Sequence, residues 1–210
     1  MKEVIIVFCS HSDDLQIGMG GSVARYAKEG KEIISVVFSY GELSNPLLKK
    51  GVLIKERVKE AREIGKFIGC KETIFLGLRD MDLEKDIKKY NIKNKVKNLI
   101  KKYKPVKIFT HSIFDPHQDH KDVGNLVIEV LDEFKGISLF AFEVWNVVHE
   151  THPRIYVDIS ETFKKKIESI KRFRSQRIYT YSLFVPVYLR AKIIGLMNGY
   201  RYGERFYKIL

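Results

Sequence analysis

The amino-acid sequence predicts an α/β fold with a doubly wound, mostly parallel sheet and helices on both of its faces. The first observation is the run Val4–Phe8, which is β-branched or aromatic at every position and typical of a strand buried on both faces. The second is the alternation of such runs with amphipathic segments over roughly the first 140 residues. The third is that polar clusters follow two of the runs directly, as at the ligand-binding edge of a Rossmann-like sheet.

The elements of the first half follow from apolar periodicity and glycine stops. A helix is expected to begin near Ile17 and to end before Gly30, because glycine readily adopts the left-handed conformation that ends helices. The next elements are predicted as a strand, a long amphipathic helix and a short strand: Glu32–Ser39, Gly51–Gly69 and Thr73–Leu76.

The second half repeats the pattern. A lysine-rich helix is predicted at Asp86–Tyr103 and stops before Pro105, because proline cannot continue a helix. The next elements are expected as strand, helix, strand, strand and helix: Val106–Thr110, Lys121–Phe134, Ser138–Phe142, Arg154–Asp158 and Lys164–Phe173. The aromatic-rich tail from Gln176 onward is expected to pack onto the body or to form a subunit contact. We therefore predict one domain over residues 1–210, with a core at about 1–160 and a C-terminal helical and aromatic elaboration at about 161–210.

Composition and charge limit the class of protein. With 45% hydrophobic and 30% charged residues, no apolar stretch of about 18 residues and no signal-peptide pattern, the sequence predicts a soluble cytoplasmic protein. Cys9 and Cys70 are expected to be buried free thiols. The net charge of +12 comes largely from lysines at helical spacing, which indicates solvated helix faces rather than a nucleic-acid surface. An anionic small substrate, such as a nucleotide sugar, fits this charge equally well.

Two polar clusters carry the candidate chemistry. The first is His11-Ser12-Asp13-Asp14, directly after the first strand, and the second is Asp115-Pro116-His117-Gln118-Asp119-His120, after the strand that ends at Thr110. Because the carboxyl ends of parallel strands meet at one edge of a sheet, both clusters are expected in one crevice. Two histidines and one carboxylate form a catalytic zinc set with one position open for water. A further carboxylate would take the proton of that water and a further histidine would stabilise the oxyanion, so the components of metal-assisted amide hydrolysis are present.

These two motifs closely resemble those of the PIG-L/LmbE-type zinc deacetylases, which remove the N-acetyl group from N-acetylglucosaminyl substrates. The first motif of that family reads His-Pro-Asp-Asp-Glu, and the second ends in His-x-x-His, usually with aspartate before the last histidine. Further likenesses run along most of the chain: Arg57 with Glu60-Ala61, Gly77-Leu78-Arg79-Asp80, Val157-Asp158-Ile159, Ser175-Gln176 and Tyr202-Gly203-Glu204-Arg205-Phe206.

The resemblance implies an enzyme that releases acetate and a free amine from an N-acetylglucosamine-type sugar or sugar conjugate. One zinc ion per chain would have three ligands, with iron(II) or cobalt(II) as alternatives for the same set: His11, Asp14 and His120. Asp13 would be the general base. His117, oriented by Asp119, would act as electrostatic stabiliser or acid. Two residues would hold the sugar: Arg57 and Asp80. Family members often form homo-oligomers, so we expect one here, without nucleic acid or a membrane span.

The sequence departs from the family pattern at two positions. Ser12 replaces the usual proline and Leu15 replaces the usual glutamate, which removes no ligand but changes the surroundings of the metal. Three other histidines are not expected to be metal ligands: His111, His149 and His152. Glu204 is expected to be a buried structural partner rather than a catalytic residue.

Other interpretations use the same residues. A metallophosphoesterase would hold two metal ions at the Asp/His-rich edge. An iron oxygenase would use His11-x-Asp13 with a distant histidine as a facial triad, although that triad usually lies on all-β scaffolds. A binding module with a structural metal is disfavoured, because structural zinc sites are closed and rich in cysteine.

Overall fold

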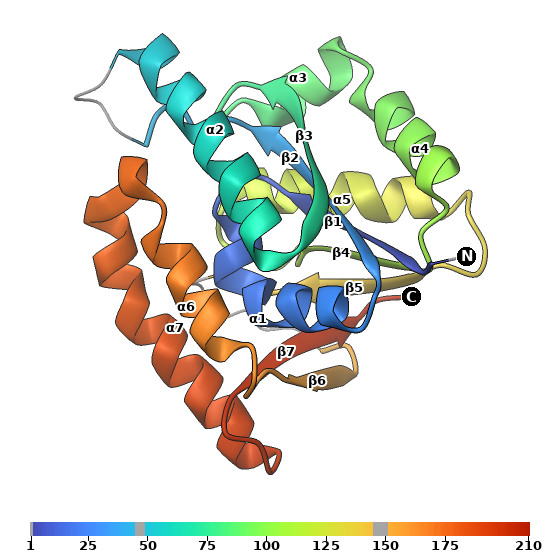
Figure 1. Ribbon diagram of the computed structural model, residues 1–210. Helices are drawn as coiled ribbons and strands as arrows, with labels where there is room; N and C mark the ends of the chain where they lie inside the picture. The colour runs from blue at the N-terminus through green and yellow to red at the C-terminus, as the bar shows by residue number, and fades with distance from the viewer. Residues whose placement is uncertain (1, 45–48, 145–150) are drawn as a thin grey trace.

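A mixed, mostly parallel sheet runs through the molecule with helices on both faces (Figure 1). The computed structural model describes residues 2–44, 49–144 and 151–210. Its strands, in sequence order, are β1 (Val4–Cys9), β2 (Glu32–Ser39), β3 (Cys70–Leu78), β4 (Lys107–His111), β5 (Ser138–Phe142), β6 (Arg154–Asp158) and β7 (Gly203–Lys208). They are arranged in the order β3-β2-β1-β4-β5-β7-β6. The first five strands of this order are parallel, and β7 is antiparallel to both of its neighbours.

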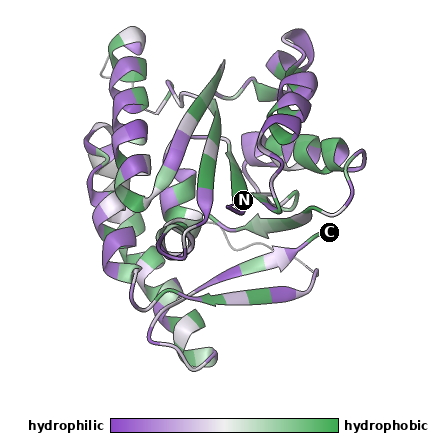
Figure 2. Ribbon diagram, turned by 45° about the vertical axis from the view of Figure 1, so that its right-hand side comes forward, coloured by the Kyte–Doolittle hydropathy of each residue, from purple (hydrophilic) through white to green (hydrophobic). Residues whose placement is uncertain are grey.

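The helices divide between the two faces of the sheet. On one face pack α1 (Asp14–Lys28), α2 (Lys50–Ile68) and α6 (Phe163–Lys171), and on the other α3 (Leu83–Lys89), α4 (Ile92–Tyr103) and α5 (Gln118–Leu131). The 3-10 turn η1 (Arg174–Gln176) leads into α7 (Arg177–Met197), which packs on α6 and β7. Figure 2 shows hydrophilic and hydrophobic residues alternating along the helices, as expected for helices that bury one side and expose the other.

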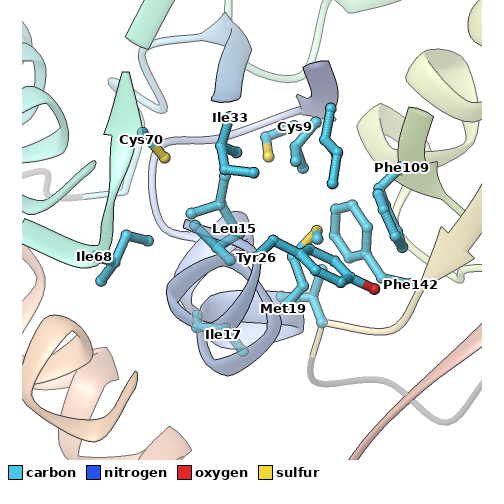
Figure 3. Close-up of a cluster of buried hydrophobic side chains, with 14 of the residues drawn as sticks. Cys9, Leu15, Ile17, Met19, Tyr26, Ile33, Ile68, Cys70, Phe109 and Phe142 are labelled. Carbon is cyan, nitrogen blue, oxygen red and sulfur yellow. The ribbon is translucent and has the colours of Figure 1, made fainter. Parts of the chain in front are cut away.

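Two hydrophobic cores, one on each face, hold the sheet. Side chains alternate in direction along a strand, so Val7 and Cys9 of β1 face the α1 side whereas Ile6 and Phe8 face the α4 and α5 side. Figure 3 shows the α1 side, where Cys9 and Cys70 lie among apolar side chains. Both cysteines are free and buried, which confirms that prediction.

The predicted fold class is confirmed, and three of the expected strands have the predicted bounds: Glu32–Ser39, Ser138–Phe142 and Arg154–Asp158. The single helix expected at Asp86–Tyr103 is wrong, because Asn91 adopts a left-handed conformation (φ +50°) that separates α3 from α4. The aromatic tail contains the long helix α7 and the strand β7. β7 enters the sheet because Phe206 is fully buried against Phe109, with ring centroids 5.0 Å apart.

The outer surface of α7 exposes a stripe of apolar side chains that recurs about every four residues: Val185, Leu189, Ile193 and Leu196. Whether copies of the chain associate stays a prediction. Within the described part of the chain, no helix is both long and apolar enough to span a membrane.

The strand order places the carboxyl ends of β1 and β4 at the point where the direction of winding reverses. From β1 the chain continues to β2 and β3 on one side, and it then returns to β4 on the other side of β1. Helices after β1 and β4 lie on opposite faces of the sheet, which leaves a crevice between their N-terminal loops. The two polar clusters of the sequence lie in these two loops and in the first turns of the helices that follow them.

Candidate metal centre

The two loops are joined by Ser10, which follows β1. Its amide donates a hydrogen bond to His111 Nε2 at 3.0 Å, and its hydroxyl donates to the backbone oxygen of Asp119 at 3.0 Å. His111 ends β4, and Asp119 lies in the first turn of α5. The position of the second loop relative to the first is therefore fixed by hydrogen bonds as well as by the sheet.

His11, Asp14 and His120 form a compact buried group. One ligand atom from each lies within 4.8 Å of the others, and the side chains are almost inaccessible to solvent. Asp14 is the first residue of α1, where the positive end of the helix dipole favours a carboxylate. The sequence predicted these three residues as ligands, and the fold brings them together.

Surrounding side chains hold the carboxylate of Asp14 and the ring of His120. Asp14 Oδ2 accepts a hydrogen bond from the His11 amide at 2.8 Å and lies 3.1 Å from His111 Nε2. His120 Nδ1 lies 3.1 Å from Asp115 Oδ2, which leaves Nε2 directed toward Asp14. Burial alone raises the pKa of Asp14, but His120 and His111 hold this pKa well below its usual value. Asp14 is therefore ionised, as a metal ligand must be.

His11 also belongs to a second group of metal-ligating residues. Its Nε2 lies 3.1 Å from Asp80 Oδ1 and 3.2 Å from Asp119 Oδ2, and the three ligand atoms again lie within 4.8 Å of one another. Burial lowers the pKa of His11, but the hydrogen bonds to Asp119 and Asp80 raise it to about 10. The carboxylates around His11 therefore create a strong local attraction for a cation.

Asp13 and His117 face a cavity of about 460 Å³ beside this group. Asp13 is 13% exposed, and burial raises its pKa while Arg57 opposes the rise. His117 is half-buried at the start of α5, with its ring centroid 5.2 Å from that of His11 and 4.6 Å from that of His120. Burial, aided by the charge of His120, lowers the pKa of His117 and favours its neutral form.

Arg57 is only 1% exposed, and its guanidinium forms hydrogen bonds with other groups of the protein. Its guanidinium donates to Ser12 Oγ at 3.2 Å, to Ser44 Oγ at 2.6 Å and to the backbone oxygen of Gly41. Gly41 has φ +64°, and a Cβ there would overlap the guanidinium, so only glycine fits. The serine that replaces the family's proline thus supplies a partner for Arg57, while Leu15 packs into the hydrophobic core.

Asp80, in the loop after β3, and Asp119, in the first turn of α5, both approach His11. Asp80 also accepts a hydrogen bond from the Leu43 amide at 3.1 Å and lines the cavity. Asp119 Oδ2 also accepts one from the amide of Met81 at 3.0 Å, and Met81 adopts the unfavourable left-handed conformation (φ +63°). The predicted role of Asp119, orienting His117, stays a prediction.

Three residues that contact the centre were not predicted as part of it: His111, Asp115 and Gln176. His111 is the last residue of the buried strand β4, and a histidine there gives no sign in the sequence that it faces the centre. Asp115 lies in the second motif, but its position there did not indicate contact with His120. Glu204 is confirmed as a buried structural partner, since it accepts hydrogen bonds from the amides of Gly21 and Ser22 and from Lys166. His152 is half-buried just before β6, and His149 lies outside the described residues.

Comparison with known protein families matches residues 6–131 to the family described as PIG-L, GlcNAc-PI de-N-acetylase. This range is more than half of the chain and contains both polar motifs. Diacetylchitobiose deacetylase of Thermococcus kodakarensis is 24% identical over 92% of this chain and 78% of its own length.

Similar folds occur in solved structures with different described activities. The N,N'-diacetylchitobiose deacetylase of Pyrococcus horikoshii superposes with a TM-score of 0.84 at 24% identity, over 99% of this chain and 84% of that one. The 4-carboxy-2-hydroxymuconate hydratase of Pseudomonas putida superposes with a TM-score of 0.86 at 18% identity, over 99% and 96%. A teicoplanin deacetylase, described in a zinc inhibited form, superposes with a TM-score of 0.77 at 13% identity, over 98% and 97%.

Proposed function

This chain belongs to the PIG-L family, and from that membership and the geometry of the centre we propose that it is a metal-dependent N-deacetylase. Its substrate would be an N-acetylglucosamine-type sugar or sugar conjugate, from which it releases acetate and a free amine. The observation that carries this proposal is the buried group His11, Asp14 and His120, of which His11 lines a cavity that Asp13 also lines.

The residues present fit a divalent metal ion. Asp14 Oδ1 is buried and accepts no hydrogen bond from any described residue. It lies 3.6 Å from His120 Nε2, and two ligands of a tetrahedral zinc ion at about 2.1 Å lie roughly 3.4 Å apart. We propose one zinc ion per chain, held by His11, Asp14 and His120, with iron(II) or cobalt(II) as alternatives. A bound metal ion would polarise the amide carbonyl and lower the pKa of a water molecule.

Asp13 and His117 supply the proton transfers in this proposal. Asp13 would take the proton from water, and burial supports this role because a raised pKa makes the carboxylate a stronger base. His117 would stabilise negative charge on the acyl oxygen or protonate the leaving amine. Both side chains line the same cavity as His11. After the reaction, Asp13 and Asp80 would face the positively charged product amine.

The charges in the cavity favour an uncharged substrate. The charged or titratable residues among those that line it are two histidines, two aspartates and one arginine: His11, Asp13, Arg57, Asp80 and His117. Arg57 directs its guanidinium at protein groups, so within the described lining no lysine or arginine is left to bind a phosphate. Lysines that contribute to the net charge instead pair with glutamates on helices, as Lys93 does with Glu129. A nucleotide sugar is therefore a poorer candidate than a neutral glycoside.

The decisive experiment measures metal content and amine release on one preparation. Chelator-treated, zinc-loaded and iron-loaded protein would be compared with N-acetylglucosamine, diacetylchitobiose and UDP-N-acetylglucosamine. We expect one metal ion per chain and metal-dependent amine release from a neutral sugar. His120→Ala would lose the metal, whereas Asp13→Asn would keep it and lose about 10²- to 10⁴-fold in turnover.

Two further substrates test the competing functions. A phosphate monoester tests for a metallophosphoesterase, and an unsaturated dicarboxylate tests for a hydratase, because one similar structure is described as such. Activity on either, without amine release from any acetylated sugar, would contradict the proposal. If Asp13→Asn kept most of the wild-type turnover, Asp13 would not be the base.

A further inference from the structure

Gln176 brings a side-chain amide from the C-terminal segment to two charged residues beside the metal centre. It is the last residue of η1 and only 7% exposed. Its hydrogen-bonding partners determine the orientation of the amide. Nε2 donates to Asp13 Oδ2 at 3.0 Å, and Oε1 accepts from Arg57 Nη2. The opposite orientation would place the amide oxygen against a carboxylate and the amide nitrogen against a guanidinium.

Glu60 fixes the segment that carries Gln176. Its carboxylate accepts hydrogen bonds from the amide of Arg174 at 3.0 Å, the amide of Ser175 at 3.1 Å and the hydroxyl of Ser175 at 2.6 Å. Glu60 follows Arg57 by three residues on α2, and residues with this spacing lie on the same side of a helix. One turn of α2 therefore carries both Glu60, which binds the residues before Gln176, and Arg57, which Gln176 contacts.

Among the described residues, the contact with Gln176 is shorter than that of Arg57 to the carboxylate of Asp13. Arg57 Nη2 lies 3.5 Å from Asp13 Oδ1, whereas Gln176 Nε2 lies 3.0 Å from Oδ2. A neutral amide can hold a carboxylate in one orientation without adding a positive charge, which would weaken the carboxylate as a base. This combination suits a residue that orients a general base.

We propose that Gln176 is a positioning residue that holds the carboxylate of Asp13 in the orientation from which it takes a proton. The C-terminal segment then completes a site whose other residues come from the first 120 positions. This inference rests on the proposed role of Asp13 as general base. It makes the pair Glu60 and Gln176 one functional unit, because Glu60 acts on Asp13 only through the turn at 174–176.

The first test removes the side-chain amide in two variants, one that keeps the length of the side chain and one that does not. In Gln176→Met the packing is kept and both hydrogen bonds are lost, and in Gln176→Ala both are lost. We expect either variant to lower kcat by about 10- to 100-fold, because small misplacements of a catalytic group have effects of this size. KM and metal content should stay at the wild-type values. If Gln176→Met restored the wild-type kcat, the role of Gln176 would be packing alone and the proposal would be wrong.

The second test uses the coupling between Glu60 and Gln176. Glu60→Ala should lower kcat by a similar factor, and the double variant should be little worse than either single variant, because both changes break the same contact. Glu168→Ala is the matched control. Glu168 lines the same groove as Glu60 but pairs only with Arg172 among described residues, so its loss should leave kcat unchanged. Multiplicative losses in the double variant would contradict the proposed unit.

A readout without substrate separates this inference from the proposed function. In ¹⁵N-labelled protein the side-chain amide protons of Gln176, assigned by their absence in Gln176→Met, should exchange slowly with water. Asp13→Ala and Glu60→Ala should both shift these signals and speed their exchange, whereas Glu168→Ala should not. Unchanged signals in Asp13→Ala would overturn the inference whatever the enzyme's substrate. Altered signals together with no amine release in the wild type would support the contact and reject the deacetylase.

Discussion

Asp115 gives the most direct test of the metal centre that leaves every proposed ligand in place. Its Oδ2 lies 3.1 Å from His120 Nδ1, and its Oδ1 accepts a hydrogen bond from the His117 amide at 2.9 Å. Asp115 and His120 are both fully buried. In Asp115→Asn the side chain keeps one acceptor oxygen for two donors, so either His120 or His117 loses its partner.

The expected loss in metal affinity follows from this arrangement. Carboxylates that orient a metal-bound histidine typically contribute 10- to 100-fold in metal affinity, which is about 1.4–2.7 kcal/mol. We therefore expect the zinc Kd of Asp115→Asn to rise by a factor in that range, measured by competition with a chelator. The control is Asp122→Asn, the same change on α5, where the carboxylate accepts only from Gln118 among described side chains. A Kd for Asp115→Asn equal to that of the control would refute the assignment of His120 as a ligand through Nε2.

Three further predictions concern stability. Glu204→Gln should destabilise the fold by about 3–5 kcal/mol, because it leaves the buried Lys166 charge unpaired; Lys166→Met should cost less in urea unfolding, because two backbone amides still bind Glu204. The hydrogen bond from Arg79 holds the pKa of Asp86 below its usual value in the folded protein. The ion pair therefore stabilises the fold at pH values above the pKa of Asp86 in the unfolded chain, and this stabilisation is lost as the pH falls through the lower pKa of the folded protein. Asp86→Asn should therefore be destabilising in urea at pH 7 and close to neutral near pH 2, and an equal effect at both would contradict this. Zinc at 100 times its Kd should stabilise chelator-treated protein by about 2.7 kcal/mol, and an unchanged melting temperature would argue against a bound metal.

The sequence was most informative where a single strand or loop decides the structure. Runs such as Ile33–Phe38 are buried on both faces, so their composition alone identifies them as central strands. Residues that follow such strands must lie at the carboxyl edge of the sheet, which is why His11 and His120 were predicted as neighbours across about a hundred residues.

Features that depend on distant partners left no comparable signal. β7 alternates only weakly between polar and apolar residues, and it becomes a strand because Phe206 fits against Phe109. Gln176 lies 163 positions from Asp13, and the likeness of Ser175-Gln176 to the family pattern did not indicate that the two side chains meet. Asn91 interrupts a continuous lysine-rich pattern, since the spacing of apolar residues is similar on both sides of the break. Long-range packing decided the first two cases, whereas the third is a local change of backbone conformation at Asn91.

The sheet itself sets the spacing of the proposed metal ligands. β1 and β4 are adjacent parallel strands with Ile5 opposite Lys107, and neighbouring strands are separated by about 4.8 Å. A loop that leaves each strand at the same edge therefore begins within reach of the other, and the hydrogen bonds of Ser10 remove the freedom that remains. A zinc ion held as proposed would need the residues that follow both strands to place its ligand atoms within a few tenths of an ångström. Because a rigid sheet provides this accuracy, the loops can change in sequence, as at Ser12 and Leu15, while the ligand positions are kept.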